Sequence, residues 1–359
     1  MKKIKRYPTA AQRKKKKTIR NLAISISAFA AACCAAVIVI SGLDDEPSKP
    51  AIAPADSVSV TAVTEATLPP IAEVTVTHTE TEPEEEPIIF TRPMKTENTK
   101  EFSDMHVTAR NGILIDAETG EVLGRKSSLK KIYPASMTKV MTLLVAVENL
   151  TESDMEQKVT MTYDMLAPLI ADNASRVGYE VDEEASVRDM LYGLILPSGA
   201  DAAVGLSQYI AGNEENFVKL MNEKAAELGL EETHFENCTG LHGKSHYTTC
   251  VEMSMIMKAA MENPLCKEIL STYKYTTEAT EQHPDGIPLY SNMFSRMYGD
   301  EVEDVIILSG KTGYTDQAAH CLVTYAEKDD HGYISVIGGD YDKYAAVYST
   351  FAIYENYLP

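Results

Sequence analysis

The spacing of hydrophobic positions divides the chain beyond residue 101 into a β-rich start, a helical middle and a β-rich end. Alternating hydrophobic and polar residues around a turn at Glu118-Thr119-Gly120 predict two short strands within 112–125. Hydrophobic residues three and four apart predict helices over 136–150, 186–196, 200–212, 216–230 and 251–263. Short apolar runs predict strands over 305–310, 321–328 and 333–340, followed by a closing helix over 342–358. This order predicts an α+β fold in which the first and last segments form one antiparallel sheet around a helical insertion.

The first predicted helix has a clear start. Pro134 disfavours helical backbone at Tyr133, so Ser136 is expected to open the helix. The hydrophobic stripe of this helix consists of Met137, Val140, Met141, Leu144 and Val147. In a helix, Lys139 lies close to Ser136 on the same face, so the two side chains can meet.

The first hundred residues lack this periodicity. Residues 1–21 form a basic tail, with ten Lys or Arg and no acid among the first 20 residues. Residues 22–43 carry no charge, and such a run is about long enough to cross a hydrocarbon layer of roughly 30 Å as a helix. We expect a single-pass anchor in the cell membrane, with the remainder of the chain on the extracellular side. A cleaved signal peptide, which would release a secreted protein, is the alternative.

Residues 44–100 are rich in Glu, Asp, Pro and Thr, as in THTETEPEEEP. Such a composition cannot bury enough apolar surface to fold, so we expect a disordered linker ahead of one folded domain over 101–359. The net charge is −20 at pH 7 despite the basic tail, so the exported part is strongly acidic. This charge argues against a nucleic-acid partner.

The pattern Ser-x-x-Lys occurs four times, starting at Ser127, Ser128, Ser136 and Ser271. Only Ser136 opens a predicted helix that holds serine and lysine on one face. Serine is a poor nucleophile at neutral pH unless a base accepts its proton. The helix N-terminus and a half-buried position both favour the neutral amine of Lys139, which could be that base. A capping serine followed by a solvated lysine is the alternative interpretation.

Two later segments add groups suited to acyl transfer. The stretch PSGADAA offers the Ser198 hydroxyl as a proton relay in a turn between two predicted helices. In the stretch LSGKTGYTD a predicted strand ends with Lys311, Thr312 and Gly313. Lys and Thr can bind a substrate carboxylate, and the glycine allows a peptide to approach the strand edge closely. Ser-x-x-Lys, Ser-x-Asn and Lys-Thr-Gly in this order are the signature of penicillin-binding proteins and class A β-lactamases.

The chain resembles the D-alanyl-D-alanine carboxypeptidase family of low-molecular-weight penicillin-binding proteins. The likeness runs from residue 105 to about 340 and includes LIDAETGEVL, YPASMTKVMT and SGKTGYT in family order. It implies a β-lactamase/transpeptidase-like fold with a sheet lobe and an all-helical lobe. It also implies a serine-type peptidase that removes the terminal D-Ala from peptidoglycan stem pentapeptides and is inhibited covalently by β-lactams. In this likeness Ser136 is the acylated nucleophile, Lys139 its base, and Ser198 a helper in proton transfer.

The resemblance assigns substrate binding to the Lys-Thr-Gly segment. Lys311 and Thr312 would hold the terminal carboxylate of D-Ala-D-Ala, and Gly313 would border the substrate. The backbone N–H groups of Ser136 and Tyr314 would form the oxyanion hole. The resemblance implies no metal and no organic cofactor.

Ala200 departs from the family pattern, because the middle motif normally has Asn at this position. A methyl group cannot hydrogen-bond the substrate amide or orient Lys139. Three functions stay open: a D-Ala-D-Ala carboxypeptidase, another acyl-enzyme activity such as a D,D-endopeptidase or β-lactamase, and a weakly active or non-catalytic domain that binds wall peptide or penicillin. Class A β-lactamases deacylate with a Glu, which no motif locates in this chain.

The segment CTGLHGKSHYTTC raises a metal alternative. Cys238, His242, His246 and Cys250 follow one another at four-residue steps, and mixed Cys and His ligands suit zinc. The spacing lacks a Cys-x-x-Cys knuckle, and the loop matches a metal-free segment of the family, so we expect no metal. An exported domain permits disulfides, and Cys238 with Cys250 is the pair that we expect if one forms.

Overall fold

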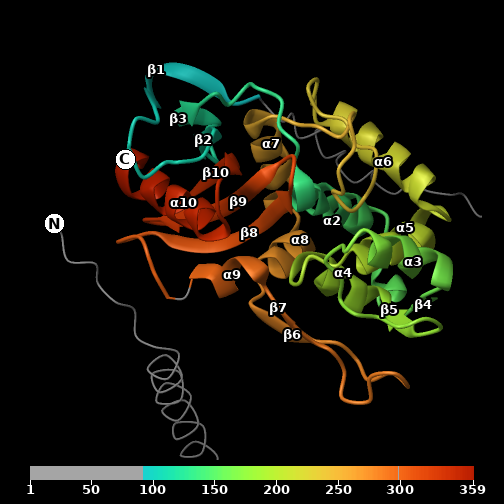
Figure 1. Cartoon of the computed structure of the whole chain (residues 1–359). Coiled ribbons are helices and arrows are strands. Elements are labelled where there is room, and N and C mark those ends of the chain that lie inside the picture. The colour runs from blue at the N-terminus through green and yellow to red at the C-terminus, as the bar shows by residue number, and fades with distance from the viewer. Residues whose placement is uncertain (1–91, 298) are drawn as a thin grey trace, which may run out of the picture. The chain divides into compact units, whose positions relative to one another are not determined.

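A computed structural model describes residues 92–297 and 299–359. Its central feature is a six-stranded sheet in the order β1-β3-β2-β10-β9-β8 (Figure 1). The strands are β1 (Met94–Glu101), β2 (Asn111–Asp116), β3 (Glu121–Lys126), β8 (Ile306–Thr315), β9 (Ala319–Lys328) and β10 (His331–Asp340). Neighbouring strands are antiparallel except for β1 and β3, which are parallel. The first and last segments therefore share one sheet, as the sequence predicts.

The strands β2 and β3 form the predicted hairpin. Asp116 Oδ1 accepts hydrogen bonds from the backbone N–H groups of Glu118 at 3.0 Å and Thr119 at 2.8 Å. Gly120 closes the turn with a φ of 73°, a conformation that glycine adopts without a steric penalty. Strand β2 then pairs with β10, where Ile113 lies opposite Val336.

Alternate residues of the central strands face two separate hydrophobic clusters. Ile113 and Ile115 belong to the cluster that includes buried residues of α7 (Cys250–Glu262). Leu114, between them, belongs to the cluster that includes buried residues of α10 (Lys343–Tyr357). Because successive side chains of a strand point to opposite faces, α7 and α10 cover the two faces of the sheet.

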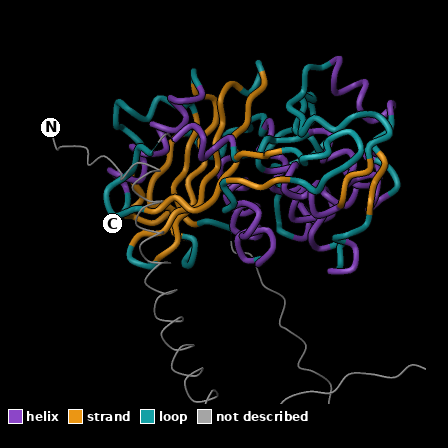
Figure 2. The backbone as a smooth tube through the Cα atoms, turned by 90° about the horizontal axis from the view of Figure 1, so that it is seen from below, coloured by secondary structure: helices purple, strands orange, loops and turns teal. Residues whose placement is uncertain are grey.

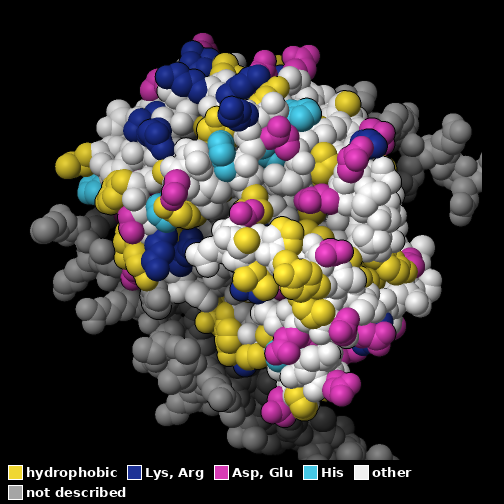
Figure 3. All heavy atoms as spheres, turned by 45° about the vertical axis from the view of Figure 1, so that its right-hand side comes forward, with side chains coloured by type: hydrophobic (Ala, Val, Ile, Leu, Met, Phe, Trp, Pro, Cys, Tyr) yellow, Lys and Arg dark blue, Asp and Glu magenta, His cyan; other side chains and the backbone are white. Residues whose placement is uncertain are grey.

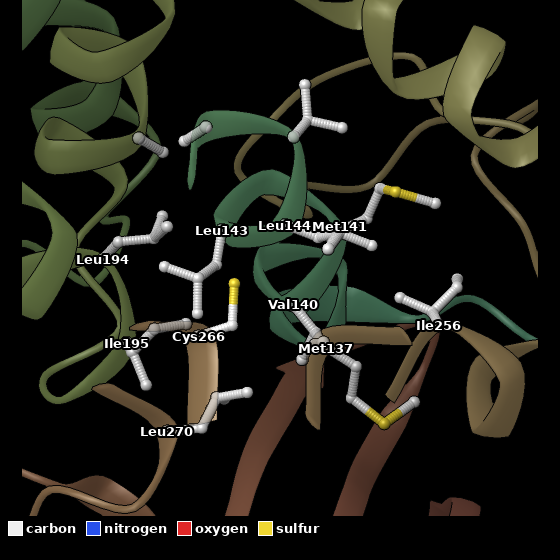
Figure 4. Packing of buried hydrophobic residues seen from close by; sticks show 14 of the residues in the cluster. Met137, Val140, Met141, Leu143, Leu144, Leu194, Ile195, Ile256, Cys266 and Leu270 are labelled. Carbon is white, nitrogen blue, oxygen red and sulfur yellow. The ribbon is translucent and has the colours of Figure 1, made fainter. Parts of the chain in front are cut away.

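The helical middle of the chain forms a second lobe, and Figure 2 shows most strands in one half of the molecule and most helices in the other. The helices of this part are α2 (Lys139–Glu148), α3 (Tyr163–Ala171), α4 (Val187–Ile195), α5 (Ala200–Ala211), α6 (Glu214–Glu227) and α8 (Pro264–Leu270). Helix α2 is the core of the lobe. Its Val140 and Leu143 lie among Leu194 and Ile195 from α4 and Leu270 from α8 (Figure 4).

Several short elements complete the described fold. They are η1 (Ala135–Thr138), η2 (Glu152–Asp154), α9 (Asn292–Met297), β4 (Lys158–Thr160) paired with β5 (Glu184–Ser186), and β6 (Lys274–Thr276) paired with β7 (Pro288–Tyr290). Helices α3, α8 and α9 and the strands β4 to β7 have no counterpart among the elements predicted from the sequence. Helix α8 has only 7 residues and each of these strands has only 3, so they are too short to show a hydrophobic period in the sequence. Helix α3 carries Pro168 inside it, which disguises a helical pattern.

Two predicted boundaries around the motifs are wrong. The helix expected to open at Ser136 begins with the 3-10 turn η1, and α2 starts at Lys139. Pro134 directly precedes η1, and no side-chain hydrogen bond caps the N-terminal end of this turn. Strand β8, whose apolar run covers 305–310 and which is expected to end with the Lys-Thr-Gly motif, continues beyond the motif to Thr315.

The predicted start of the folded domain at residue 101 is also wrong, because β1 already belongs to the sheet. This strand is polar and largely exposed, so it shows no hydrophobic alternation. Its backbone pairs with β3, and two side-chain hydrogen bonds hold it, from Thr96 Oγ1 to Glu121 Oε1 and from Thr99 Oγ1 to Val122 O, both 2.7 Å long. The linker composition therefore continues into the first strand.

The basic tail at 1–21, the expected anchor at 22–43 and the linker up to residue 91 lie outside the described residues. Within the described part, no helix is both long and apolar enough to cross a membrane. Figure 3 shows acidic side chains spread over the face formed largely by helices, while Lys and Arg gather toward its upper left. The many acidic side chains on this face agree with the net charge of −20 for the whole chain.

Candidate active site

Ser136 and Lys139 meet because the chain turns tightly between them. Ser136 lies in η1, Lys139 begins α2, and Lys139 Nζ is 3.2 Å from Ser136 Oγ. Ser136 is half-buried, whereas Lys139 is only 2% exposed. The contact expected from the sequence is present, although a 3-10 turn and not an α-helix produces it.

The backbone just before Ser136 is tightly packed against a neighbouring loop. Ala135 has a left-handed φ of 47°, which turns the chain sharply after Pro134. Gly240 lies against this turn, and a Cβ at Gly240 would come within 2.1 Å of the Ala135 carbonyl oxygen. Only glycine allows the two backbones to lie this close, so the loop around Gly240 is part of the wall behind Ser136.

Burial is the largest influence on the charge of Lys139. The loss of water lowers the pKa of Lys139 to about 8, while the nearby Cys238 and Asp201 side chains act in the opposite direction. Part of the Lys139 population is therefore uncharged near neutral pH, and its lone pair can accept the Ser136 hydroxyl proton. Lys139 Nζ also donates a hydrogen bond of 2.5 Å to the Thr239 carbonyl oxygen.

Ser198 and Lys311 bring the helical lobe and the sheet together. Lys311 Nζ donates to Ser198 Oγ at 2.8 Å and to the Thr312 carbonyl oxygen at 3.0 Å. Burial lowers the pKa of Lys311 well below its ordinary value, and the neighbouring charges of Lys139 and Arg296 lower it further. Among the described residues, no carboxylate forms an ion pair with Lys311. A substrate carboxylate bound here would favour the charged amine.

Asn292, which no sequence motif singles out, supports the backbone next to Ser198. Ser198 has a φ of 69°, a left-handed conformation that is costly for a side chain with a Cβ. The Asn292 backbone N–H donates to the Leu196 carbonyl oxygen, and its Nδ2 donates to the Pro197 carbonyl oxygen, both at 2.9 Å. These bonds hold the two residues before Ser198 and help to keep its hydroxyl on Lys311. This role could not be predicted from the sequence, because Asn292 begins a helix of only 6 residues, which is too short to give a recognisable hydrophobic pattern.

Strand β8 provides the edge expected from the Lys-Thr-Gly motif. It is the last strand of the sheet, and Thr312 is buried within it. A Cβ at Gly313 would lie 2.8 Å from the Pro134 carbonyl oxygen and 3.2 Å from the Ser136 nitrogen, so β8 passes directly beside η1. Tyr314 is 53% exposed, and its ring stacks on His320 with 4.4 Å between the ring centres.

Ala200 and Asp201 have structural surroundings at the start of α5. Ala200 is buried, and its backbone N–H donates to the Ser175 carbonyl oxygen at 2.8 Å. Asp201 is fully buried and accepts hydrogen bonds from the backbone N–H groups of Val177 at 2.8 Å and Gly178 at 3.0 Å. The acid after the motif therefore fastens the neighbouring loop to α5. The Ala200 side chain offers no acceptor to Lys139.

The other three Ser-x-x-Lys patterns have no comparable arrangement. Lys131, which belongs to the pattern at Ser128, forms an ion pair with Glu232 at 3.0 Å. Ser271 follows α8 and shares a hydrogen bond of 2.6 Å with Ser309. Ser127 lies in a turn with a φ of 47°. Of the four, Ser136 is the serine whose hydroxyl contacts the lysine of its own pattern in the described part.

The possible zinc ligands have other partners. His246 Nε2 is 2.8 Å from Thr138 Oγ1, and its Nδ1 accepts from a backbone N–H at 3.1 Å. The Cys238 thiol lies 3.1 Å from Glu214 Oε1, and the His242 ring packs edge-on against Tyr133. No group of three or more His, Cys, Asp or Glu side chains in the described residues could hold a metal ion. The four described cysteines are free and buried, so Cys238 and Cys250 are not joined.

The sequence profile of the D-alanyl-D-alanine carboxypeptidase peptidase family matches residues 96–341 of the chain. The chain belongs to this family. The match spans the whole arrangement described above, from the edge strand β1 through η1 to the end of β10.

Named relatives agree with the family match. D-alanyl-D-alanine carboxypeptidase DacF of Bacillus subtilis is 36% identical over 243 residues, which cover 67% of this chain and 59% of the relative. D-alanyl-D-alanine carboxypeptidase DacC of Escherichia coli is 31% identical over 239 residues, which cover 65% of this chain and 57% of the relative. The chain thus spans less than two thirds of the length of these relatives.

Solved structures show the same fold. The crystal structure of the Streptomyces K15 DD-transpeptidase is 26% identical, with a TM-score of 0.62 and coverage of 69% of this chain and 96% of that one. Penicillin binding protein 5 from Haemophilus influenzae is 27% identical, with a TM-score of 0.61 and coverage of 69% and 70%. These similarities confirm the predicted fold class of a sheet lobe with a helical lobe. The roles of individual site residues stay predictions.

Proposed function

We propose that the chain is a serine-type D-Ala-D-Ala carboxypeptidase that removes the terminal D-Ala from peptidoglycan stem pentapeptides. The observation that carries this proposal is the distance of 3.2 Å between Ser136 Oγ and the buried Nζ of Lys139. A pKa of about 8 makes this amine a base near neutral pH. Family membership supplies the substrate class, since the named relatives are D-alanyl-D-alanine carboxypeptidases.

The first half of the reaction forms an acyl-enzyme. Lys139 accepts the hydroxyl proton as Ser136 Oγ bonds to the carbonyl carbon of the penultimate D-Ala. The carbonyl oxygen becomes an oxyanion that the backbone N–H groups of Ser136 and Tyr314 would bind, and such a donor contributes about 3 kcal/mol. The carbon–nitrogen bond then breaks, and the proton passes to the leaving amine with help from Ser198. Free D-Ala departs.

The second half releases the shortened peptide. Lys139 accepts a proton from water, the water oxygen bonds to the ester carbon, and the bond to Ser136 Oγ breaks. The proton returns to Oγ, which regenerates the hydroxyl. The products are the stem tetrapeptide and the free enzyme, and the atoms balance without a cofactor.

Lys311 and Thr312 are the proposed partners of the substrate carboxylate. Lys311 is 1% exposed, and hydrogen bonds to Ser198 and the Thr312 carbonyl oxygen hold its amine. A carboxylate at this point would offset the burial that disfavours the charged amine. The terminal carboxylate of D-Ala-D-Ala supplies such a group, and a β-lactam carboxylate would occupy the same position in a covalent inhibitor complex.

We also propose that this domain works on the cell-wall side of the membrane. The support is the basic segment 1–21 followed by the uncharged segment 22–43, an order that directs the remaining chain outside. Peptidoglycan is found there, so the proposed substrate and the proposed location agree. Membrane fractionation of the full chain, with and without residues 22–43, tests this part: removal of the segment should release the protein.

A stem pentapeptide assay tests the proposed activity. Incubation with the purified protein should release D-Ala and leave a tetrapeptide, as measured by mass spectrometry. Ser136→Ala should abolish the release, whereas Ser271→Ala, a serine of another Ser-x-x-Lys pattern, should retain it. Cleavage of cross-linked dimers without release of D-Ala would favour the endopeptidase alternative. Binding of the pentapeptide with no cleavage would favour the non-catalytic alternative.

A further inference from the structure

The turn between Asn237 and Leu241 contacts the reactive lysine directly. Lys139 Nζ donates to the Thr239 carbonyl oxygen at 2.5 Å, which is shorter than its 3.2 Å approach to Ser136. One turn further along α2, Thr142 Oγ1 donates to the Cys238 carbonyl oxygen at 2.7 Å. Two successive carbonyl groups of the turn therefore bind side chains of α2.

The side chain of Asn237 organises this turn. Its Oδ1 accepts hydrogen bonds from the Thr239 N–H at 3.2 Å, the Thr239 hydroxyl at 3.0 Å and the Gly240 N–H at 2.7 Å. Its Nδ2 donates to the Leu241 carbonyl oxygen at 3.0 Å. One side chain thus contacts three consecutive residues and fixes the direction of the Thr239 carbonyl group.

Two further contacts hold the turn against η1. Gly240 lies so close to Ala135 that no larger residue fits without a shift. At the other end of the loop, His246 Nε2 is 2.8 Å from Thr138 Oγ1. Burial lowers the pKa of His246 to about 4, so the ring is neutral at physiological pH and can donate to Thr138 while its Nδ1 accepts. The loop therefore has a defined position relative to the catalytic turn.

We propose that Asn237 is a positioning residue that fixes the Thr239 carbonyl group as the acceptor that orients the Lys139 amine, a task that Ala200 cannot perform. This inference rests on the proposed function of Lys139 as the base. A neutral amine has two N–H groups and one lone pair. When one N–H is committed to the Thr239 oxygen, the directions left to the lone pair are restricted, and Ser136 Oγ lies in reach.

The kinetics of acylation by a fluorescent penicillin test this proposal. Asn237→Ala should lower the acylation rate constant at saturating penicillin by roughly 10- to 100-fold, because a shift of about 1 Å in a reacting group has such an effect. The concentration for half-saturation should change little, since the hydrogen bonds of the Asn237 side chain all lie within its own turn. The loss should persist at pH 9.5, where Lys139 is neutral in both proteins, because orientation and not charge is impaired.

Asn222→Ala is the matched control. Asn222 also holds a loop through its amide, with Oδ1 accepting from the Phe235 N–H at 2.9 Å and Nδ2 donating to the Phe235 carbonyl oxygen at 3.0 Å. This variant should lose stability comparably but retain the acylation rate constant. Equal rate constants for Asn237→Ala and Asn222→Ala would overturn the proposal. If Asn237→Ala does not fold, Asn237→Asp preserves the Oδ1 contacts but replaces the donation to Leu241 by a contact between two oxygens and adds a negative charge to the turn. At pH 9.5, where Lys139 is neutral, this variant should retain most of the acylation rate constant, and a loss of 10-fold or more in the folded variant would contradict the proposal.

A double-mutant cycle with Ala200→Asn provides the sharpest evidence. Ala200→Asn introduces an alternative acceptor for the amine, so Asn237→Ala should reduce the rate constant less in that background than in the parent protein. Equal reductions in both backgrounds would contradict a shared task. A parent protein that is not acylated at Ser136 would refute the proposed function itself, which separates that failure from a failure of the Asn237 proposal.

Discussion

The two edge strands of the sheet, β1 and β8, differ in how far their side chains are buried and in which residues lie beside them. Strand β1 exposes most of its side chains, and its charged residues make that edge unattractive to other strands. Strand β8 buries residues 309–313 in its middle and leaves Tyr314 exposed. The edge of β8 passes beside Ser136, and its Lys311 contacts Ser198. We propose that the edge of β8 is kept free for a substrate peptide, because Ser136, Ser198 and Lys311 lie along it.

Loss of charge at the β8 edge should have the largest effect. Lys311→Met keeps an unbranched side chain but removes the ammonium, so the turnover of pentapeptide should fall by about 100-fold or more, the scale of a lost electrostatic contact in a transition state. Melting temperature should change little, because the loss of the hydrogen bonds to Ser198 and the Thr312 carbonyl oxygen is offset by the removal of a buried amine that has no carboxylate partner among the described residues. Lys95→Met, an exposed position of β1, serves as the control and should retain full turnover. Parallel losses of turnover and melting temperature in Lys311→Met would indicate a structural role.

The pH dependence of acylation should depend on the buried Lys139 beside the β8 edge. Because the pKa of Lys139 is lowered to about 8 and only its neutral form accepts a proton, the rate constant at saturating penicillin should rise with pH and level off above about 8. Below that value the neutral fraction, and with it the rate, should fall about tenfold per pH unit. Stopped-flow fluorescence between pH 6 and 9.5 measures this profile. A rate that is constant from pH 6 to 8 would argue against Lys139 as the base.

Glycine substitutions compare the packing of the two edges. Gly313→Ala places a Cβ 2.8 Å from the Pro134 carbonyl oxygen and should move β8 from η1, so acylation should fall about tenfold or more. Gly124→Ala, next to β1, meets the Phe102 ring at 2.3 Å and should reduce stability while the acylation rate is retained. Acylation rates and thermal melts of both variants would show the contrast. An acylation rate in Gly313→Ala equal to that of the parent would mean that β8 need not lie this close to Ser136.

The smallest expected effect lies at the β1 edge. Thr99→Val removes the hydrogen bond to the Val122 carbonyl oxygen, which should lower the free energy of unfolding by about 1 kcal/mol. Acylation should not change, because β1 and β8 lie at opposite ends of the sheet. Chemical denaturation measures the first quantity and fluorescent penicillin the second. A slower acylation rate in this variant would show that the two edges are coupled.

Local patterns in the sequence predict much of the fold. The hairpin around Gly120, the helices α4 to α7 and the strands β9 and β10 follow from hydrophobic periods of sufficient length. The helix predicted from residue 186 begins with a cap, in which the Ser186 side chain accepts a hydrogen bond of 3.1 Å from the Asp189 N–H. Strand β1 escapes prediction because its stability comes from pairing with β3 and not from a buried face of its own.

Part of the site also follows from local patterns in the sequence. Ser136 with Lys139, and Lys311 with Ser198, come from motifs whose members lie on elements that the fold brings together. Asn292 escapes prediction because it acts through backbone carbonyl groups of another segment, and Asn237 because it acts through the backbone of its own turn. Neither kind of contact leaves a periodic signal in a single sequence. The Thr239 carbonyl group, which we propose as the acceptor that Ala200 cannot provide, likewise reaches Lys139 only in the folded loop.

Peptide mapping of a penicillin adduct tests the central claim most directly, namely that the Ser136 hydroxyl beside a neutral Lys139 is the nucleophile. The purified protein is incubated with penicillin, digested and analysed by mass spectrometry. We expect one covalent adduct on the peptide that carries Ser136, and its loss in both Ser136→Ala and Lys139→Met. An adduct on another serine, or one that persists in Ser136→Ala, would contradict this account.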